Sequence, residues 1–135
     1  MKKKKEKSLP KLKNDLQMIF NRFIRLRDKG LPCISCGQHK FEIQAGHFYP
    51  VKGYDGLRYD EENVHGECAG CNGFDDAHLI GYADNLLEKL GTERYLALKE
   101  RAAEYKRNGY KFSRSEISEK TEYYKRKVAE LENNA

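Results

Sequence analysis

The chain has 135 residues, of which 35% are charged and 39% hydrophobic, and its formal net charge is +5. This length favours a single domain, and so few apolar residues give a lean core that a metal ion or disulfides often reinforce. No apolar run approaches the roughly 18 residues of a membrane span, and no apolar segment follows the lysine-rich start as in a secretory signal. We therefore expect a cytoplasmic protein with no membrane partner.

The charge is distributed unevenly along the chain. Residues 1–29 have eleven Lys or Arg against three Asp or Glu, residues 33–91 have four against ten, and residues 92–135 have eleven against eight. Basic flanks around an acidic centre suit a protein that grips a phosphate backbone while its centre holds divalent cations. For the run Lys2–Lys7, a nucleic-acid contact and a merely solubilising tail are both open.

The first predicted elements are a tail and a helix. Residues 1–9 are nearly all charged, which predicts a disordered basic tail. Apolar side chains then recur at helical spacing, which predicts an amphipathic N-terminal helix over residues 10–31 that packs on the core. Gly30 and Pro32 are expected to stop it. Its arginines could in addition contact a nucleic-acid backbone: Arg22, Arg25 and Arg27.

Residues 32–91 are expected to form the core of the protein, and two Cys-x-x-Cys pairs frame most of it. Pairs of this kind are typical of a tetrahedral zinc site, whereas a disulfide framework spreads its cysteines along the chain. Four thiolates close the tetrahedron and leave no position for water, so the zinc is predicted to be structural. Its predicted ligands are Cys33, Cys36, Cys68 and Cys71.

Between the pairs, residues 41–45 alternate apolar and polar, which predicts a short strand with Gly46 and His47 at its end. Residues 48–62 then form a long polar loop, and loops of that length are uncommon unless they are functional. A second short strand, from Asn63 to His65, is expected to lead into the second cysteine pair.

The helix predicted to open at Asn72 brings oxygen ligands to one face, because Asp75 and Asp76 follow it by three and four positions. Such ligands suit Mg²⁺ or Mn²⁺. A neutral histidine opposite them, His47, could take a proton from water. The alternatives are a histidine held in the core or beside the zinc, and acids that only stabilise a helix start.

The remainder of the chain is predicted to be helical. One helix runs from Leu79 and stops at Gly91, and residues 92–135 form a C-terminal helical region with Thr92 as an N-cap and a capping box at Ser113–Glu116. A heptad-like seam over residues 117–131 favours packing back on the body and leaves a homodimer open.

The ordered combination of Cys33-x-x-Cys36, Gly46-His47, Asn63 and Cys68-x-x-Cys71-Asn72 resembles the HNH, or ββα-metal, endonucleases. More specifically, the segments 23–28 and 31–37 look like those of the lambdoid phage NinG (Rap) recombination protein family. The likeness continues through Leu90-Gly91 and less clearly to the end. It implies an α+β fold with a small zinc-stapled ββα-metal core, flanked by an N-terminal amphipathic helix and C-terminal helices.

This resemblance also implies a function. The family is expected to supply a phage or prophage endonuclease that acts in the bacterial host on Holliday junctions and other branched double-stranded DNA, beside other phage recombination proteins. In that comparison His47 is the general base, Asn63 orients it through the loop backbone, and Asn72 binds a catalytic Mg²⁺ or Mn²⁺. Asp76 sits where a further ligand can stand, and the role of His65 is open between phosphate contact, metal-shell partner and structural hydrogen bond.

One position departs from the pattern. Many HNH enzymes have Asp or His immediately before the base, as a metal ligand, and this chain has Gly46 there. The resemblance therefore requires a ligand elsewhere, in Asp75, Asp76 or His78, although His78 is otherwise predicted to be a surface residue, like His39. The rival hypothesis is a non-catalytic zinc-containing DNA-binding or recombination accessory protein.

Overall fold

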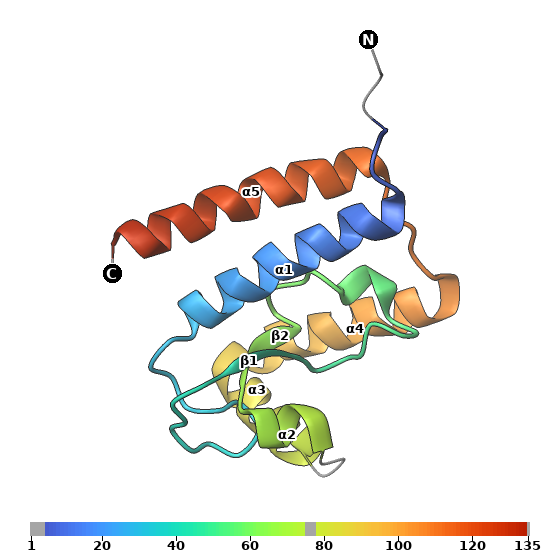
Figure 1. Ribbon diagram of the computed structural model, residues 1–135. Helices are drawn as coiled ribbons and strands as arrows, with labels where there is room; N and C mark the ends of the chain where they lie inside the picture. Colours follow the sequence, from blue (N-terminus) through green and yellow to red (C-terminus); the bar gives the residue numbers. More distant parts are fainter. Residues whose placement is uncertain (1–4, 75–77, 135) are drawn as a thin grey trace.

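The computed structural model describes residues 5–74 and 78–134, and within them it has five α-helices and one two-stranded sheet (Figure 1). The predicted α+β class is confirmed. In chain order the elements are α1 (Leu9–Arg27), β1 (Gln44–His47), the 3₁₀ helix η1 (Asp55–Leu57), β2 (Val64–Glu67), α2 (Ala69–Phe74), α3 (His78–Leu90), α4 (Thr92–Asn108) and α5 (Arg114–Asn133).

Helix α1 is capped by Ser8, whose hydroxyl oxygen accepts a hydrogen bond from the backbone N–H of Lys11 at 3.3 Å. The helix therefore begins inside the segment 1–9 that the sequence predicted to be a disordered tail; residues 1–4 of that segment lie outside the described residues. It ends at Arg27 rather than near residue 31, because Asp28 caps it and Gly30 adopts a φ of 85°.

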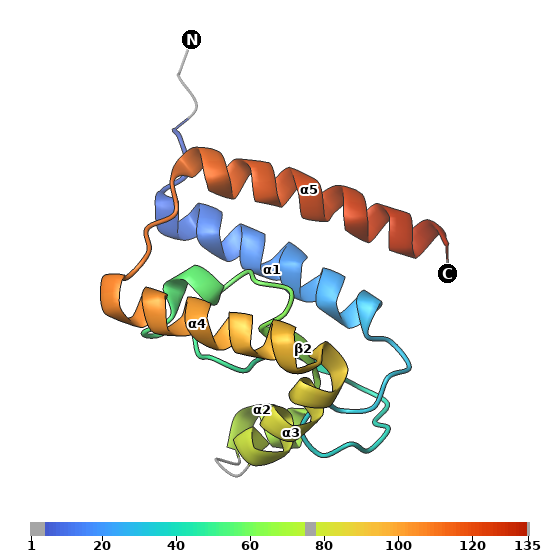
Figure 2. The ribbon, with the colours of Figure 1, turned by 180° about the vertical axis from the view of Figure 1, so that it is seen from behind.

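Helix α5 lies side by side with α1 along most of its length, as both views show (Figures 1 and 2). The ring of Tyr124 packs edge-on against Phe20, with 4.9 Å between centroids, and Ile117 and Val128 are buried beside it. These are residues of the heptad-like seam, so its apolar side chains are covered by α1 of the same chain. The predicted capping box is confirmed, since Ser113 and Glu116 exchange both hydrogen bonds.

The sheet lies between two apolar clusters. Strand β1 pairs antiparallel with β2, and His47 lies opposite Val64 while Gly46 lies opposite His65. Because side chains alternate between the faces of a strand, Val64 joins the cluster of α1 and α5, and His65 points to the other side. There the second cluster joins α3 and α4 to the loop around η1, with Tyr82, Leu86 and Leu98 fully buried.

Two element boundaries differ from the prediction. The first strand covers residues 44–47 and not 41–45, because Phe41 is fully exposed and has no core to pack against. The helix after the second cysteine pair begins at Ala69, so Asn72 lies within α2 and does not open it. Asp75 and Asp76, predicted to follow in its first turn, lie outside the described residues.

In the described ranges 5–74 and 78–134, none of the helices combines the length and the apolar character that crossing a membrane requires.

Candidate metal and nuclease site

The four cysteines come together next to the end of β2, since Cys68 directly follows that strand. One sulfur from each of Cys33, Cys36, Cys68 and Cys71 lies within 4.8 Å of all the others, and the thiols are free. A tetrahedron of sulfurs around zinc has edges of roughly 3.8 Å, given Zn–S bonds of about 2.3 Å. The cluster therefore fits a Cys₄ metal site such as zinc, as the sequence predicted.

The backbone around Cys33 prepares its sulfur for a metal. Burial by itself would raise the pKa of this thiol, but backbone N–H groups point at the sulfur and bring its pKa below the usual value. Two of these donors belong to Cys36 and Cys68, with N–S distances of 3.5 and 3.3 Å. The turn thus favours the thiolate, which is the form that binds zinc.

The first cysteine turn is fixed to both β2 and α3. The N–H of Ile34 donates to the carbonyl of Gly66 at 3.0 Å, and the Asn85 side chain donates to the carbonyl of Ile34 at 2.8 Å. Helix α3 approaches so closely that a Cβ at Gly81 would lie 2.1 Å from the carbonyl oxygen of Ser35. The cysteine cluster, the sheet and α3 are therefore held together by direct contacts.

His47 is the last residue of β1 and is half-buried. Its Nε2 lies 2.9 Å from the carbonyl oxygen of Arg58, which can only accept, so Nε2 has the proton. Burial is the main cause that lowers the pKa of His47, although the same carbonyl opposes it. At neutral pH the ring is therefore neutral, and its Nδ1 has the free lone pair.

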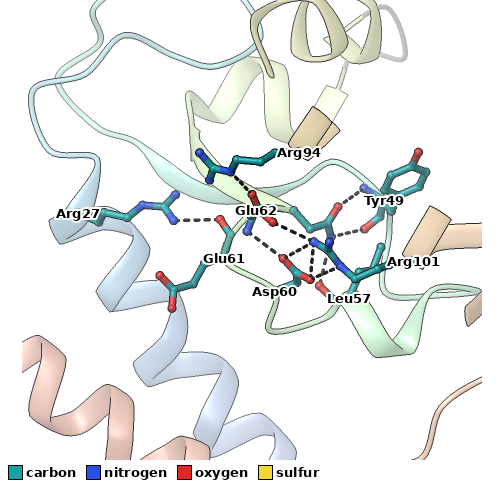
Figure 3. Close-up of polar contacts among 9 residues, drawn as sticks. Arg27, Tyr49, Leu57, Asp60, Glu61, Glu62, Arg94 and Arg101 are labelled. Carbon is teal, nitrogen blue, oxygen red and sulfur yellow. Dashed lines mark hydrogen bonds and ion pairs between the residues drawn. The ribbon is translucent and has the colours of Figure 1, made fainter. Parts of the chain in front are cut away.

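Asn63 is fully buried and holds the long loop in place. Its amide oxygen accepts from the N–H of Tyr49 at 2.8 Å, and its amide nitrogen donates to the carbonyls of Tyr49 and Leu57 at 3.0 and 3.2 Å. Dashed lines in Figure 3 mark these contacts to Tyr49 and Leu57, which together we call the loop clamp. Arg58 follows Leu57 directly, so Asn63 fixes the carbonyl that orients His47. The role of Asn63 in catalysis stays a prediction.

The acidic end of the loop is neutralised by arginines from other elements (Figure 3). Arg101 of α4 contacts Asp60 at 3.1 Å and Glu62 at 3.2 Å, and Arg94 contacts Glu62 at 2.6 Å. Arg27 donates to the carbonyls of Glu61 and Val64, so this arginine is committed inside the protein and is not free to bind DNA, contrary to the prediction. These acids anchor the loop.

His65 is 2% exposed and lies on the opposite face of the sheet from His47. Burial, followed by the positive charges of Arg27 and Lys89, lowers the pKa of His65 to about 3. Its Nδ1 lies 3.4 Å from the hydroxyl of Tyr82. Of the three roles left open by the sequence, this position favours the structural hydrogen bond.

Asn72 is exposed on α2, where its amide nitrogen donates to Oε1 of Gln44 at 2.8 Å. Gln44 lies opposite Glu67 in the sheet, so these side chains share the face opposite to His47. In the described part of the chain no hydrogen bond joins His47 to Asn72. His47 and the contact of Asn72 with Gln44 thus lie on opposite faces of β1, which pairs only with β2 among residues 5–74 and 78–134.

Glu67 was not among the site residues predicted from the sequence. This side chain is fully buried at the end of β2, its Oε2 accepts from the Ser35 hydroxyl, and the same oxygen lies 2.7 Å from Nδ1 of His78. His78 is therefore not a surface residue as predicted, since only 17% of its side chain is exposed. An acid directly before a metal-ligating cysteine is the sequence signal that could have identified it.

A groove of about 520 Å³ opens between the end of α1, the loop before β1 and the start of α2. Its lining includes four cationic side chains and two acidic ones, Glu42 and Glu132. The exposed ring of Phe41 also lines the groove. Gln44, another lining residue, accepts a hydrogen bond from Asn72. The cationic residues are Arg22, Arg25, Lys29 and Lys40.

Comparison with known proteins finds similar proteins from several phages, each described as Protein ninG. The chain is 40% identical to Protein ninG of Escherichia phage 933W over 78 residues, which are 57% of this chain and 39% of the relative. Identity is 41% over 76 residues to Protein ninG of Salmonella phage P22, covering 56% of this chain and 37% of the relative. Identity to Protein ninG of Escherichia phage lambda is 38% over 78 residues, which are 57% of this chain and 38% of the relative.

The aligned part of the chain thus spans well under half the length of these relatives. No solved structure matches the chain. A family model described as Bacteriophage Lambda NinG protein matches residues 1–134, nearly the whole chain, and the chain therefore belongs to the NinG protein family.

Proposed function

We propose that the protein is a metal-dependent endonuclease of phage recombination with an HNH-like core, acting on Holliday junctions and other branched DNA. The observation that carries the proposal is the contact between His47 and the Arg58 carbonyl. It leaves a neutral imidazole with a free Nδ1 at the end of β1, in the same small sheet that leads into the Cys₄ cluster through Cys68. A base in that state can accept a proton near neutral pH.

The chemistry follows from these positions. Nδ1 of His47 removes a proton from a water molecule as the water oxygen attacks the phosphorus atom. The bond from phosphorus to the 3′-oxygen breaks, and the 3′-oxygen takes a proton from solvent, leaving a 5′-phosphate and a 3′-hydroxyl. A bound Mg²⁺ or Mn²⁺ would stabilise the charge that develops on the phosphate and on the leaving oxygen. The Cys₄ site keeps the two strands and α2 together.

Asn72 is the described residue that we expect to hold this ion, together with a carboxylate. The predictions for Asp75 and Asp76 remain predictions, because both lie outside the described residues. The edge position of β1 supports the arrangement, since a phosphate at a strand edge can reach side chains on both of its faces.

The groove supports DNA as the substrate. Cationic side chains of its lining, such as Arg25 and Lys40, can neutralise phosphates, and the lining also includes Gln44, which is hydrogen-bonded to Asn72. Taken alone, the same groove also suits the rival hypothesis of a non-catalytic DNA-binding or accessory protein. The two hypotheses differ in whether His47 acts as a general base.

The deciding experiment incubates zinc-loaded protein with a synthetic four-way junction, a linear duplex and single-stranded DNA in Mg²⁺ or Mn²⁺. We expect the wild type to cleave the junction in preference to the duplex. His47→Ala should abolish cleavage while junction binding in a gel-shift assay survives. His39→Ala is the matched control, because His39 is exposed and lies outside the site, and it should cleave like the wild type.

Two results would count against the nuclease. If the wild type binds the junction but cleaves none of the three DNAs with either ion, the accessory hypothesis takes its place. If His47→Ala cleaves at the wild-type rate, the base lies elsewhere and the assignment of His47 fails.

A further inference from the structure

We propose that Glu67 is a ligand of a divalent metal ion, through its oxygen Oε1, on the face of the sheet that Asn72 shares. The inference rests on the proposed function, which requires a cation beside the phosphate, and it names a ligand for that cation. The four thiolates of the zinc cluster are separate from it.

The first support is a buried carboxyl group whose hydrogen bonding is incomplete. The Glu67 side chain has no exposed surface, and its Oε2 contacts the Ser35 hydroxyl and His78. Oε1 is equally buried but has no hydrogen-bond partner in the part of the chain that the structure describes. A buried carboxylate oxygen without a partner is costly, and native proteins rarely leave one unpaired. A bound cation would remove that cost.

The second support is the space made for this oxygen. Gly46 lies across the sheet, and a Cβ there would be 2.2 Å from Oε1 and 2.8 Å from the Cβ of Glu67. Every other residue type would collide with the carboxylate. The missing side chain at position 46 thus lets a carboxylate from the neighbouring strand occupy that volume.

The third support is the set of neighbouring groups. Gln44 lies opposite Glu67 in the sheet, and its side chain is bonded to Asn72. Amide and carboxylate oxygens are the donors that Mg²⁺ and Mn²⁺ prefer, whereas zinc favours the thiolates of the cysteine cluster. Ser35 and His78 fix Oε2 and so direct Oε1; we assign them positioning roles, and Ser35 links this orientation to the cysteine turn.

The test measures Mn²⁺ binding to zinc-loaded protein by electron paramagnetic resonance, with no DNA present. Glu67→Gln keeps the size of the side chain and its contact with Ser35 but removes the charge. We expect it to weaken Mn²⁺ binding at least about tenfold. Glu104→Gln is the matched control, because Glu104 is an exposed acid of α4 outside the sheet and the groove, and its affinity should equal that of the wild type. Equal affinity of Glu67→Gln and the wild type would overturn the inference, as would a wild type that binds no Mn²⁺.

A measurement on the unaltered protein covers the case in which Glu67→Gln fails to fold. Substoichiometric Mn²⁺ broadens the amide signals of residues near the ion in a ¹H–¹⁵N spectrum. We expect the signals of Gly46, Glu67 and His78 to broaden first. Broadening centred instead on Asp60 and Glu62 would place the ion at the loop and refute the assignment.

These results are separable from those of the nuclease assay. Mn²⁺ binding that depends on Glu67, without any DNA cleavage, would support the metal site and count against the proposed function. Cleavage that survives in Glu67→Gln would support the proposed function and count against Glu67 as a metal ligand.

Discussion

The carbonyl oxygen of Arg58 lies 2.9 Å from Nε2 of His47 and holds the imidazole in one tautomer. Because burial also lowers the pKa of His47 below 6.5, the neutral ring persists on the acid side of neutrality. A general base acts only when it is unprotonated, so lowering the pH removes activity only once the pKa of the folded protein is crossed. The acid limb of kcat/KM for junction cleavage should therefore have its midpoint below pH 6.5.

A profile of kcat/KM against pH at fixed Mg²⁺ measures this midpoint, with His39→Gln as the control that should leave it unchanged. A midpoint at or above pH 7 would mean that the titrating group is not a buried, neutral His47.

Replacing Asn63 by Asp should damage the loop clamp. The new oxygen would face the carbonyls of Tyr49 and Leu57, which cannot donate. We expect the free energy of unfolding to fall by about 3 kcal/mol, since two buried acceptors lose their donor. Asn14→Asp is the matched control, because Asn14 is exposed and faces the guanidinium of Arg58, which can donate to a carboxylate. Urea unfolding measures both, and equal stability of the two variants would contradict the clamp.

Gly46→Ala should destabilise the folded protein although it adds only one methyl group. The added Cβ would lie 2.2 Å from Oε1 of Glu67, so the carboxylate or the strand must move, at a cost of about 1–3 kcal/mol. Gly70→Ala in α2 meets nothing within 4 Å and should be neutral or slightly stabilising. Thermal unfolding of the two variants provides the comparison. If Gly46→Ala unfolds like the wild type, the packing of Glu67 against β1 is wrong.

Removal of the metal from the Cys₄ cluster should unfold the centre of the protein. Zinc bound by four thiolates contributes on the order of 10 kcal/mol, which is comparable to the whole stability of a small domain. We expect one zinc per chain by elemental analysis, and its loss in Cys33→Ser. Circular dichroism should then show a lowered unfolding temperature. A Cys33→Ser protein that melts like the wild type would exclude a structural metal.

The cationic groove should govern the salt dependence of DNA binding. Each lost phosphate contact should reduce the slope of log affinity against log salt by about one. We expect this for Arg25→Ala and for Lys40→Ala, which line the groove, and not for the exposed Lys111→Ala outside it. Fluorescence anisotropy over a salt series gives the slopes. Unchanged slopes for Arg25→Ala and Lys40→Ala would move the DNA-binding surface elsewhere.

Local patterns were sufficient for the parts of the molecule that local physics controls. The two cysteine pairs predicted the metal cluster, and the helical spacing of apolar residues predicted α1 and the buried face of α5. The capping box at Ser113 predicted the start of α5, because its two hydrogen bonds join residues three positions apart. The N-cap predicted at Thr92 was wrong: Thr92 is the first residue of α4, whose N-cap is Gly91 with no side-chain hydrogen bond.

Contacts between segments far apart in the sequence could not be predicted from local patterns. Glu67 and His78 meet through the packing of α3 against the cysteine turn, and nothing next to His78 in the sequence indicates that contact. Arg27 looked like a free cation on a helix, but it is bound to the loop thirty-four and thirty-seven positions further on. The strand was placed too early because alternation in 41–45 does not reveal that Phe41 has nothing to cover it.

The pairing of α1 with α5 also constrains how the chain is made. Arg22 and Glu132 contact each other across 110 positions, and the ring of Tyr124 covers one side of Phe20. At a synthesis rate of about 5–20 residues per second, the apolar stripe of α1 waits for roughly 5–20 seconds before its partner leaves the ribosome. A nascent chain stopped within α4 would therefore expose the part of the α1 stripe that α5 covers, while Tyr59 already packs against Phe20 from the other side.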